Sequence, residues 1–136
     1  MKKENVVFDA AELEMVDTAT ITLKHPRTGE EMEGATVEVY GPDSEFFQTA
    51  TTKMRARITD FITRNRGAKT EQKQKFTEEK ERERNISCIK AVNGLGFNGE
   101  PITDPKDACS RLPWVYSQAC AGMDDSGNFI KSLSAK

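Results

Sequence analysis

The chain has 136 residues, 31% of them charged, with a formal net charge of −2 and a mean hydropathy of −0.66. This length suits a single domain, residues 1–136, and the sequence contains no run of about twenty apolar residues that would span a membrane. Residues 1–42 hold 4 Lys and Arg against 9 Asp and Glu, and residues 43–90 hold 12 against 8. Neither excess is the clustered basic stripe of a nucleic-acid-binding protein, so nucleic acid is not expected as a partner.

The first part of the chain predicts an arm followed by a β-hairpin. Residues 1–16 are expected to form an N-terminal arm, in which residues 9–16 can make a short helix. Residues 18–40 then show two stretches in which apolar and polar residues alternate, as in half-buried strands. Their apolar positions are Ala19, Ile21, Leu23, Ala35, Val37 and Val39. Pro26 and Gly29 separate the two stretches, so the pattern predicts an antiparallel hairpin.

A long helix is expected over residues 43–66. Gly41 and Pro42 break the preceding strand, Asp43 or Ser44 can cap the first turn, and Gly67 can end the helix. Apolar residues recur at steps of three and four, which places them on one stripe. They are Phe46, Phe47, Ala50, Met54, Ile58, Phe61 and Ile62. Because an isolated hairpin is marginally stable, we expect its apolar face to pack on this stripe.

A second, charged helix is expected over residues 70–93. Residues 68–85 contain a single large apolar side chain, Phe76, so a charged linker is the alternative. The apolar residues between Ile86 and Val92 should bury the C-terminal end of this helix. Asn93 and Gly94 are expected to end it.

Turn signals dominate the last third of the chain. Asn98 and Gly99 between apolar residues predict either a very small hairpin or an ordered loop. Pro105 should open a short helix, which Pro113 ends before another begins. The expected fold class is therefore α+β, with the N-terminal hairpin packed on a mainly helical part, residues 43–136.

The sequence offers little that could carry out catalysis. It has one histidine, His25, in an expected turn, and no nucleophile with an evident base, so no catalytic or cofactor-binding residue is assigned. Cys88, Cys109 and Cys120 lack the spacing of a zinc site. A site formed by the three cysteines and His25 is the alternative, but small buried thiols and no metal are expected.

Aromatic residues are the candidate protein-binding positions, because such side chains often anchor interfaces. The candidates are Phe46, Phe47, Trp114, Tyr116 and Phe129. Adjacent helical residues point about 100° apart, so Phe46 and Phe47 cannot both lie at the centre of one stripe. One of the two rings is expected at the surface. For Trp114, a place in the core is the alternative.

Several segments together resemble a known family. In order they are ITLKHPRTGEEM, VEVYGPDSEFF, GFNGEPI, LPWVYSQ and GNFIKSLS. In this order the chain resembles, over nearly its whole length, the tail assembly chaperones of long-tailed bacteriophages. The resemblance implies a non-enzymatic protein of the host cytoplasm that is absent from the mature virion. Its expected partners are the tape measure protein, which it keeps soluble, and the major tail tube protein, which it helps to recruit.

Two other functions stay open at this point. One is a minor structural tail component that is retained in the virion, and the other is a small nucleic-acid-associated phage protein. Self-association is also left open as an interaction. In many members of the family a translational frameshift appends a second domain, a feature that this sequence does not decide.

Overall fold

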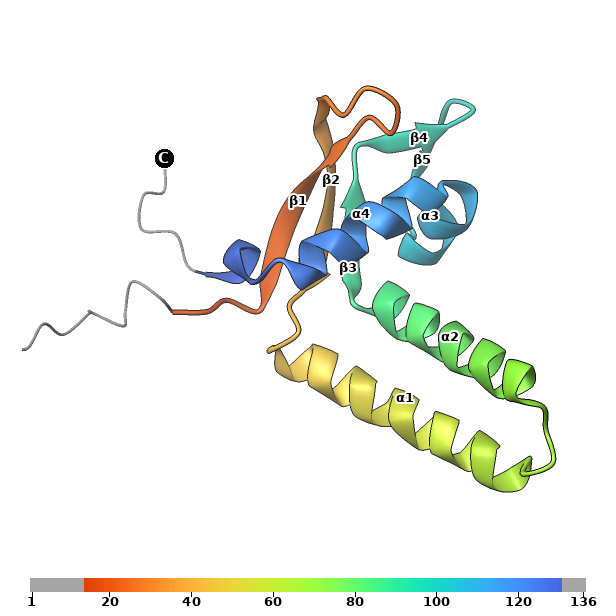
Figure 1. The fold of residues 1–136 in the computed structure, drawn as a ribbon. Coiled ribbons are helices and arrows are strands. Elements are labelled where there is room, and N and C mark those ends of the chain that lie inside the picture. The colour runs from red at the N-terminus through yellow and green to blue at the C-terminus, as the bar shows by residue number, and fades with distance from the viewer. Residues whose placement is uncertain (1–13, 131–136) are drawn as a thin grey trace, which may run out of the picture.

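The structure, a computed structural model, describes residues 14–130 and has two parts. Figure 1 shows a body, in which helices lie across a small sheet, and an arm of two long helices that extends from it. The sheet has the antiparallel order β1-β2-β3, formed by β1 (Thr18–Lys24), β2 (Glu31–Tyr40) and β3 (Ile89–Asn93). The other elements are α1 (Glu45–Arg64), α2 (Thr70–Ser87), β4 (Leu95–Phe97), β5 (Glu100–Ile102), α3 (Pro105–Arg111), α4 (Pro113–Asp124) and the 3-10 helix η2 (Ser126–Phe129). The expected α+β class is confirmed.

The N-terminal hairpin forms as the alternation predicted. Strands β1 and β2 pair with Ile21 opposite Val37 and Ala19 opposite Val39. Val37 and Val39 are fully buried, so this face of the hairpin is the floor of the core. The short helix expected at residues 9–16 lies largely outside the described residues. Within them, residues 14–16 are not helical, and Met15 forms an isolated bridge with Ile130.

The C-terminal end of the expected second helix is instead the third strand, which corrects the prediction for residues 70–93. Helix α2 ends at Ser87, and residues 89–93 pair with the second edge of β2, with Val92 opposite Val37. Ile89 and Val92 are buried at 4% and 2% exposure. The spacing of Ile86, Ile89 and Val92 suits a helix, but pairing with the β2 edge buries Ile89 and Val92 in the core, and a solvated helix would leave these two side chains in water.

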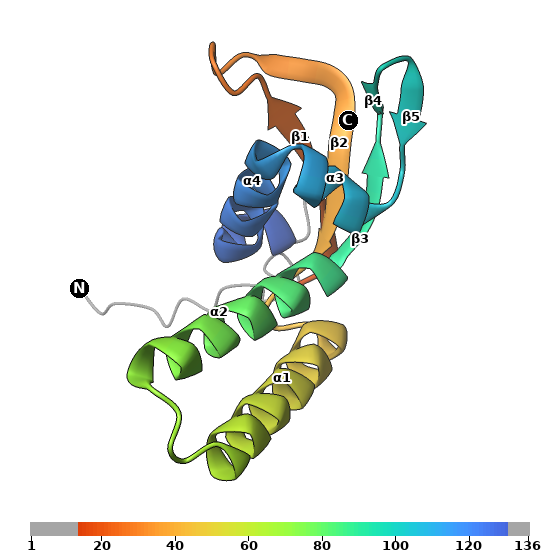
Figure 2. The ribbon, with the colours of Figure 1, turned by 90° about the vertical axis from the view of Figure 1, so that its right-hand side faces the viewer.

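Helix α4, rather than α1, covers the hairpin, so the packing expected for the long helix is wrong. Val115, Ala119 and Met123 on α4 are buried, whereas α1 has no buried residue. The approach is close, because a Cβ on Gly122 would lie 2.8 Å from Cγ1 of Ile21. The side chain of Gln118 also fixes α4 to the end of β1, accepting from Lys24 N and donating to Lys24 O, both at 2.7 Å. Figure 2 shows α4 over the sheet and α1 pointing away from it.

Helices α1 and α2 run antiparallel and form the arm. Ser44, one of the two caps that the sequence offered, caps α1 by accepting a hydrogen bond from Phe47 N at 3.2 Å. At the far end of the arm the rings of Phe61 and Phe76 stack at 4.0 Å. The arm is an insertion between neighbouring strands, and its base is closed where Tyr40 N donates to Cys88 O at 2.8 Å.

The last third of the chain follows its turn signals. Strands β4 and β5 form the small hairpin, with Asn98 and Gly99 at φ 54° and 84°, the left-handed values that a tight hairpin turn requires. Asp104 caps α3 by accepting from Asp107 N at 3.2 Å, and a proline opens each of α3 and α4. These two short helices confirm the expected C-terminal part.

Candidate functional site

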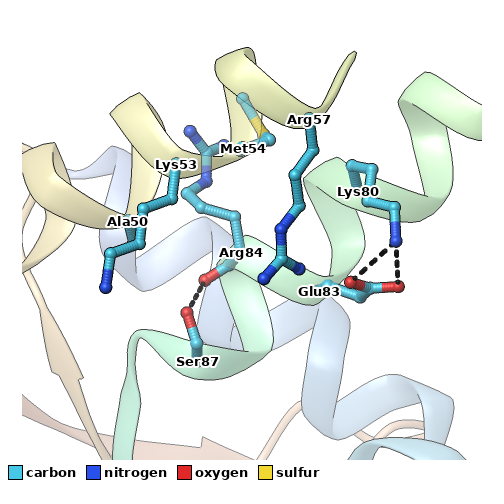
Figure 3. Close-up of a pocket in the computed structure, with 8 residues that line it drawn as sticks. All are labelled: Ala50, Lys53, Met54, Arg57, Lys80, Glu83, Arg84 and Ser87. Atoms are coloured by element: carbon cyan, nitrogen blue, oxygen red, sulfur yellow. Dashed lines mark hydrogen bonds and ion pairs between the residues drawn. The ribbon is translucent and has the colours of Figure 1, made fainter. Parts of the chain in front are cut away.

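A groove runs along one side of the arm, between its two helices. One part of it, of about 250 Å³, is shown in Figure 3 and is lined by Ala50, Lys53, Met54, Arg57, Lys80, Glu83, Arg84 and Ser87. A neighbouring hollow of about 540 Å³ shares three of these residues and adds Glu45, Phe46 and Thr49. We call these two hollows the arm groove. It extends from the base of α1 to about two thirds of the way along that helix.

The apolar floor of the groove is open because α2 has little apolar surface with which to cover it. Only Phe76 and Ile86 are large apolar residues among the eighteen residues of α2. Neither α1 nor α2 contains a buried residue, and Met54 and Ile58 are only partly buried. Phe46 and Ile62 are 46% and 39% exposed. Helix α2 therefore covers only part of the apolar stripe of α1, and the rest of the stripe faces solvent.

The groove carries more positive than negative charge. Four basic residues line it, against the two acidic residues Glu45 and Glu83. Glu83 is already paired with Lys80 at 3.2 Å. The Arg84 side chain donates to Thr51 Oγ1 at 2.9 Å, so this cation helps to hold α2 to α1. Lys53 and Arg57 make no hydrogen bond or ion pair within residues 14–130, so both charges are available to a ligand.

Of the two adjacent phenylalanines, one lies at the surface, as their angular separation predicted. Phe46 is the exposed ring, and one of its faces stacks on Tyr40 with the centroids 4.2 Å apart. The Phe46 ring also lines the arm groove. Phe47 is partly buried on the opposite side of the arm, where the guanidinium of Arg84 lies 4.6 Å from its ring centroid.

The other three candidate aromatic residues belong to the body. Trp114 is partly buried against the core. Tyr116 lies beside α2, where its hydroxyl accepts from Asn85 Nδ2 at 3.1 Å, and burial raises its pKa. Phe129 is 1% exposed, and a Cβ on Gly41 would lie 2.8 Å from its ring, so it is a core residue and not a surface anchor.

The cations of the groove were not singled out from the sequence. Lys53 and Arg57 are four residues apart and flank the stripe at Ala50 and Met54, so helical spacing alone could have placed them beside it. The position of α2 could not be read in this way, because it depends on how the arm folds back. Without α2 there is no groove, and Lys53 and Arg57 would simply belong to a solvent-exposed face of α1.

The three cysteines occupy the body, as small thiols. Cys88 and Cys109 are fully buried and Cys120 is partly buried. Burial raises the pKa of all three, that of Cys109 to about 11. His25 lies in the exposed β1–β2 turn, where Nδ1 accepts from Arg27 N at 3.1 Å. No group of three or more His, Cys, Asp or Glu side chains within residues 14–130 is arranged to hold a metal ion.

These thiols should differ in their rates of alkylation. At pH 8 a thiol with a pKa near 11 is thiolate only to about one part in 10³, so Cys109 should react very slowly with iodoacetamide in the folded protein. Cys120 should be labelled first, and all three should be labelled in guanidinium chloride. Mass spectrometry after brief labelling measures this. Equal labelling of Cys109 and Cys120 in the native protein would contradict the described burial.

Comparison with known proteins adds no relative. Neither the family models, nor the curated proteins, nor the solved structures searched contain a match to this chain. Within the described part of the chain, no helix has the length and apolar character needed to cross a membrane. The candidate site therefore rests on the geometry of the arm.

Proposed function

We propose that this protein is a non-enzymatic tail assembly chaperone of a long-tailed bacteriophage. It binds helical segments of the tape measure protein, keeps that protein soluble in the host cytoplasm and helps to recruit the major tail tube protein. The resemblance of the sequence segments suggests the client. The proposal that it binds helices rests on one observation, the arm whose apolar stripe is only half covered.

Helix binding follows from the physical chemistry of the arm. A client helix laid along the groove would bury the exposed face of Phe46 together with Ala50 and Met54, completing a three-helix packing unit. The client's own apolar residues would be removed from water by the same contact. Charged residues of both signs surround the groove, which favours dispersal of the complex over further association.

Co-expression of the tape measure protein with and without this chain tests the proposal. We expect the tape measure protein to be soluble only with its partner, and a complex to survive gel filtration. Phe46→Asp should lose this effect, because it places a carboxylate on the groove floor. Phe97→Asp is the matched control, since Phe97 is similarly exposed, at 40%, but lies on the body.

Two results would contradict the proposal. The first is a tape measure protein that is equally soluble with and without this chain. The second is recovery of the chain from purified virions in amounts comparable to those of structural proteins, because it would identify a retained tail component.

A further inference from the structure

We infer that the arm groove selects amphipathic helices whose apolar stripe is flanked by carboxylates. The inference rests on the proposed function, since it names the class of client helix, and it adds a charge rule to that function. The observation behind it is that two unpartnered cations, Lys53 and Arg57, stand over an open apolar floor.

The groove has the dimensions of a short helix-binding site. Its lining on α1 runs from Glu45 to Arg57, a distance of about 18 Å at 1.5 Å per residue. This length accommodates about three turns of a second helix. Phe46, Ala50 and Met54 succeed one another at steps of four along the floor, the spacing at which a facing helix can insert its own apolar residues.

The charges lie where the flanks of such a helix would pass. Lys53 and Arg57 are one turn apart on the same face of α1, and Figure 3 shows Arg57 extending from α1 toward α2. Lys80 lies on the opposite wall, where it is ion-paired with Glu83. A carboxylate-flanked helix would pair with these cations, whereas a lysine-flanked helix would be repelled by them.

The other side of the arm lacks this combination. There a hollow of about 450 Å³ is lined by Pro42, Phe47, Gln48, Thr51, Thr52, Arg55 and Arg84. Most of its lining residues are polar or charged, and Arg84, which lines both sides of the arm, is already hydrogen-bonded to Thr51. Arg55 therefore provides a matched control, because it lies on the same helix and carries the same charge but faces away from the arm groove.

Two synthetic peptides test the charge rule. Both carry the same leucine stripe at helical spacing, and the flanking positions are glutamate in one and lysine in the other. We expect the glutamate peptide to bind the full-length protein about tenfold more tightly at low salt, as two or three exposed ion pairs allow. Fluorescence anisotropy measures both affinities, and the difference should shrink at high salt.

Charge-reversed variants test whether Lys53 and Arg57 cause the preference for the glutamate peptide. The double variant K53E/R57E should prefer the lysine peptide, K53Q/R57Q should bind both peptides about equally, and R55E should keep the wild-type preference. The glutamine variant provides the test if the charge-reversed one does not fold, which circular dichroism establishes. Equal affinity of the wild-type protein for the two peptides would overturn the inference. An effect of R55E as large as that of K53E/R57E would do the same.

Other occupants of the groove give different results. A dimer of the free protein that K53E/R57E dissociates would assign the groove to a second copy of this chain and overturn the inference. Displacement of the glutamate peptide by duplex DNA would assign the cations to phosphate binding and would also overturn the inference.

A tape measure protein kept soluble equally well by wild-type protein and K53E/R57E would overturn the charge rule alone. Binding of the glutamate peptide without any effect on the tape measure protein would refute the proposed function but support the charge rule.

Discussion

Replacing Val37 with aspartate should abolish cooperative folding of the body. Val37 is fully buried on the central strand β2, opposite Ile21 of β1 and Val92 of β3. Both facing side chains are apolar and carry no positive charge, so the substitution buries an unpaired carboxylate. The expected loss exceeds about 4 kcal/mol, a large part of the stability of a domain of this size. Thermal unfolding followed by circular dichroism should show no cooperative transition.

Thr20→Asn is the control for this substitution, because asparagine has the shape of aspartate but puts no second negative charge opposite Glu38. Thr20 lies on the neighbouring strand but is exposed, so its replacement should cost less than about 1 kcal/mol. A wild-type melting temperature for Val37→Asp would mean that the core described for the body is wrong.

Replacing Phe129 with alanine should cost about 3–5 kcal/mol, the usual effect of removing a buried aromatic ring. The ring is 1% exposed and lies against the backbone at Gly41, where even an added methyl group would clash with it. Because Gly41 comes directly before the arm, the cavity would loosen the point at which the chain leaves the sheet. Urea unfolding measures the loss as a lower midpoint.

Phe97→Ala provides the matched control, because this ring is 40% exposed and its nearest cation, Arg111, lies 5.3 Å from its centroid. Its removal should cost less than about 1 kcal/mol. If Phe129→Ala keeps wild-type stability but weakens client binding, Phe129 is a binding anchor after all. Its place in the core would then be wrong.

Local signals in the sequence predicted the elements that local interactions decide. The alternation around Ile21 and Val37 predicted the first hairpin. Asn98 and Gly99 indicated either the second hairpin or an ordered loop, and Asp43 or Ser44 was expected to cap the long helix, which Ser44 does. Each of these features depends on residues a few positions apart. Their physical causes can therefore be read along the chain.

Long-range pairing decided the elements that the sequence left undetermined or misplaced. Residues 89–93 have a spacing that fits a helix, and only the free edge of β2 makes them a strand. The choice of α4 over α1 as the cover of the sheet depends on Ala119 and Gly122, which allow close approach, a property that apolar periodicity does not report. Among the candidate site residues, helix geometry predicted that one of Phe46 and Phe47 lies at the surface, but Lys53 and Arg57 become candidates only once α2 lies beside them.

The hydrogen bond from Tyr40 N to Cys88 O closes the base of the arm, so the length of the two arm helices can change independently of the sheet. Since the chain leaves and re-enters the sheet at one point, whole turns can be inserted into or deleted from both helices without changing the register of β2 and β3. Seven residues added to each helix would lengthen the groove by about 10 Å. The length of helix that the proposed binding groove would accommodate can thus vary while the body keeps the same core.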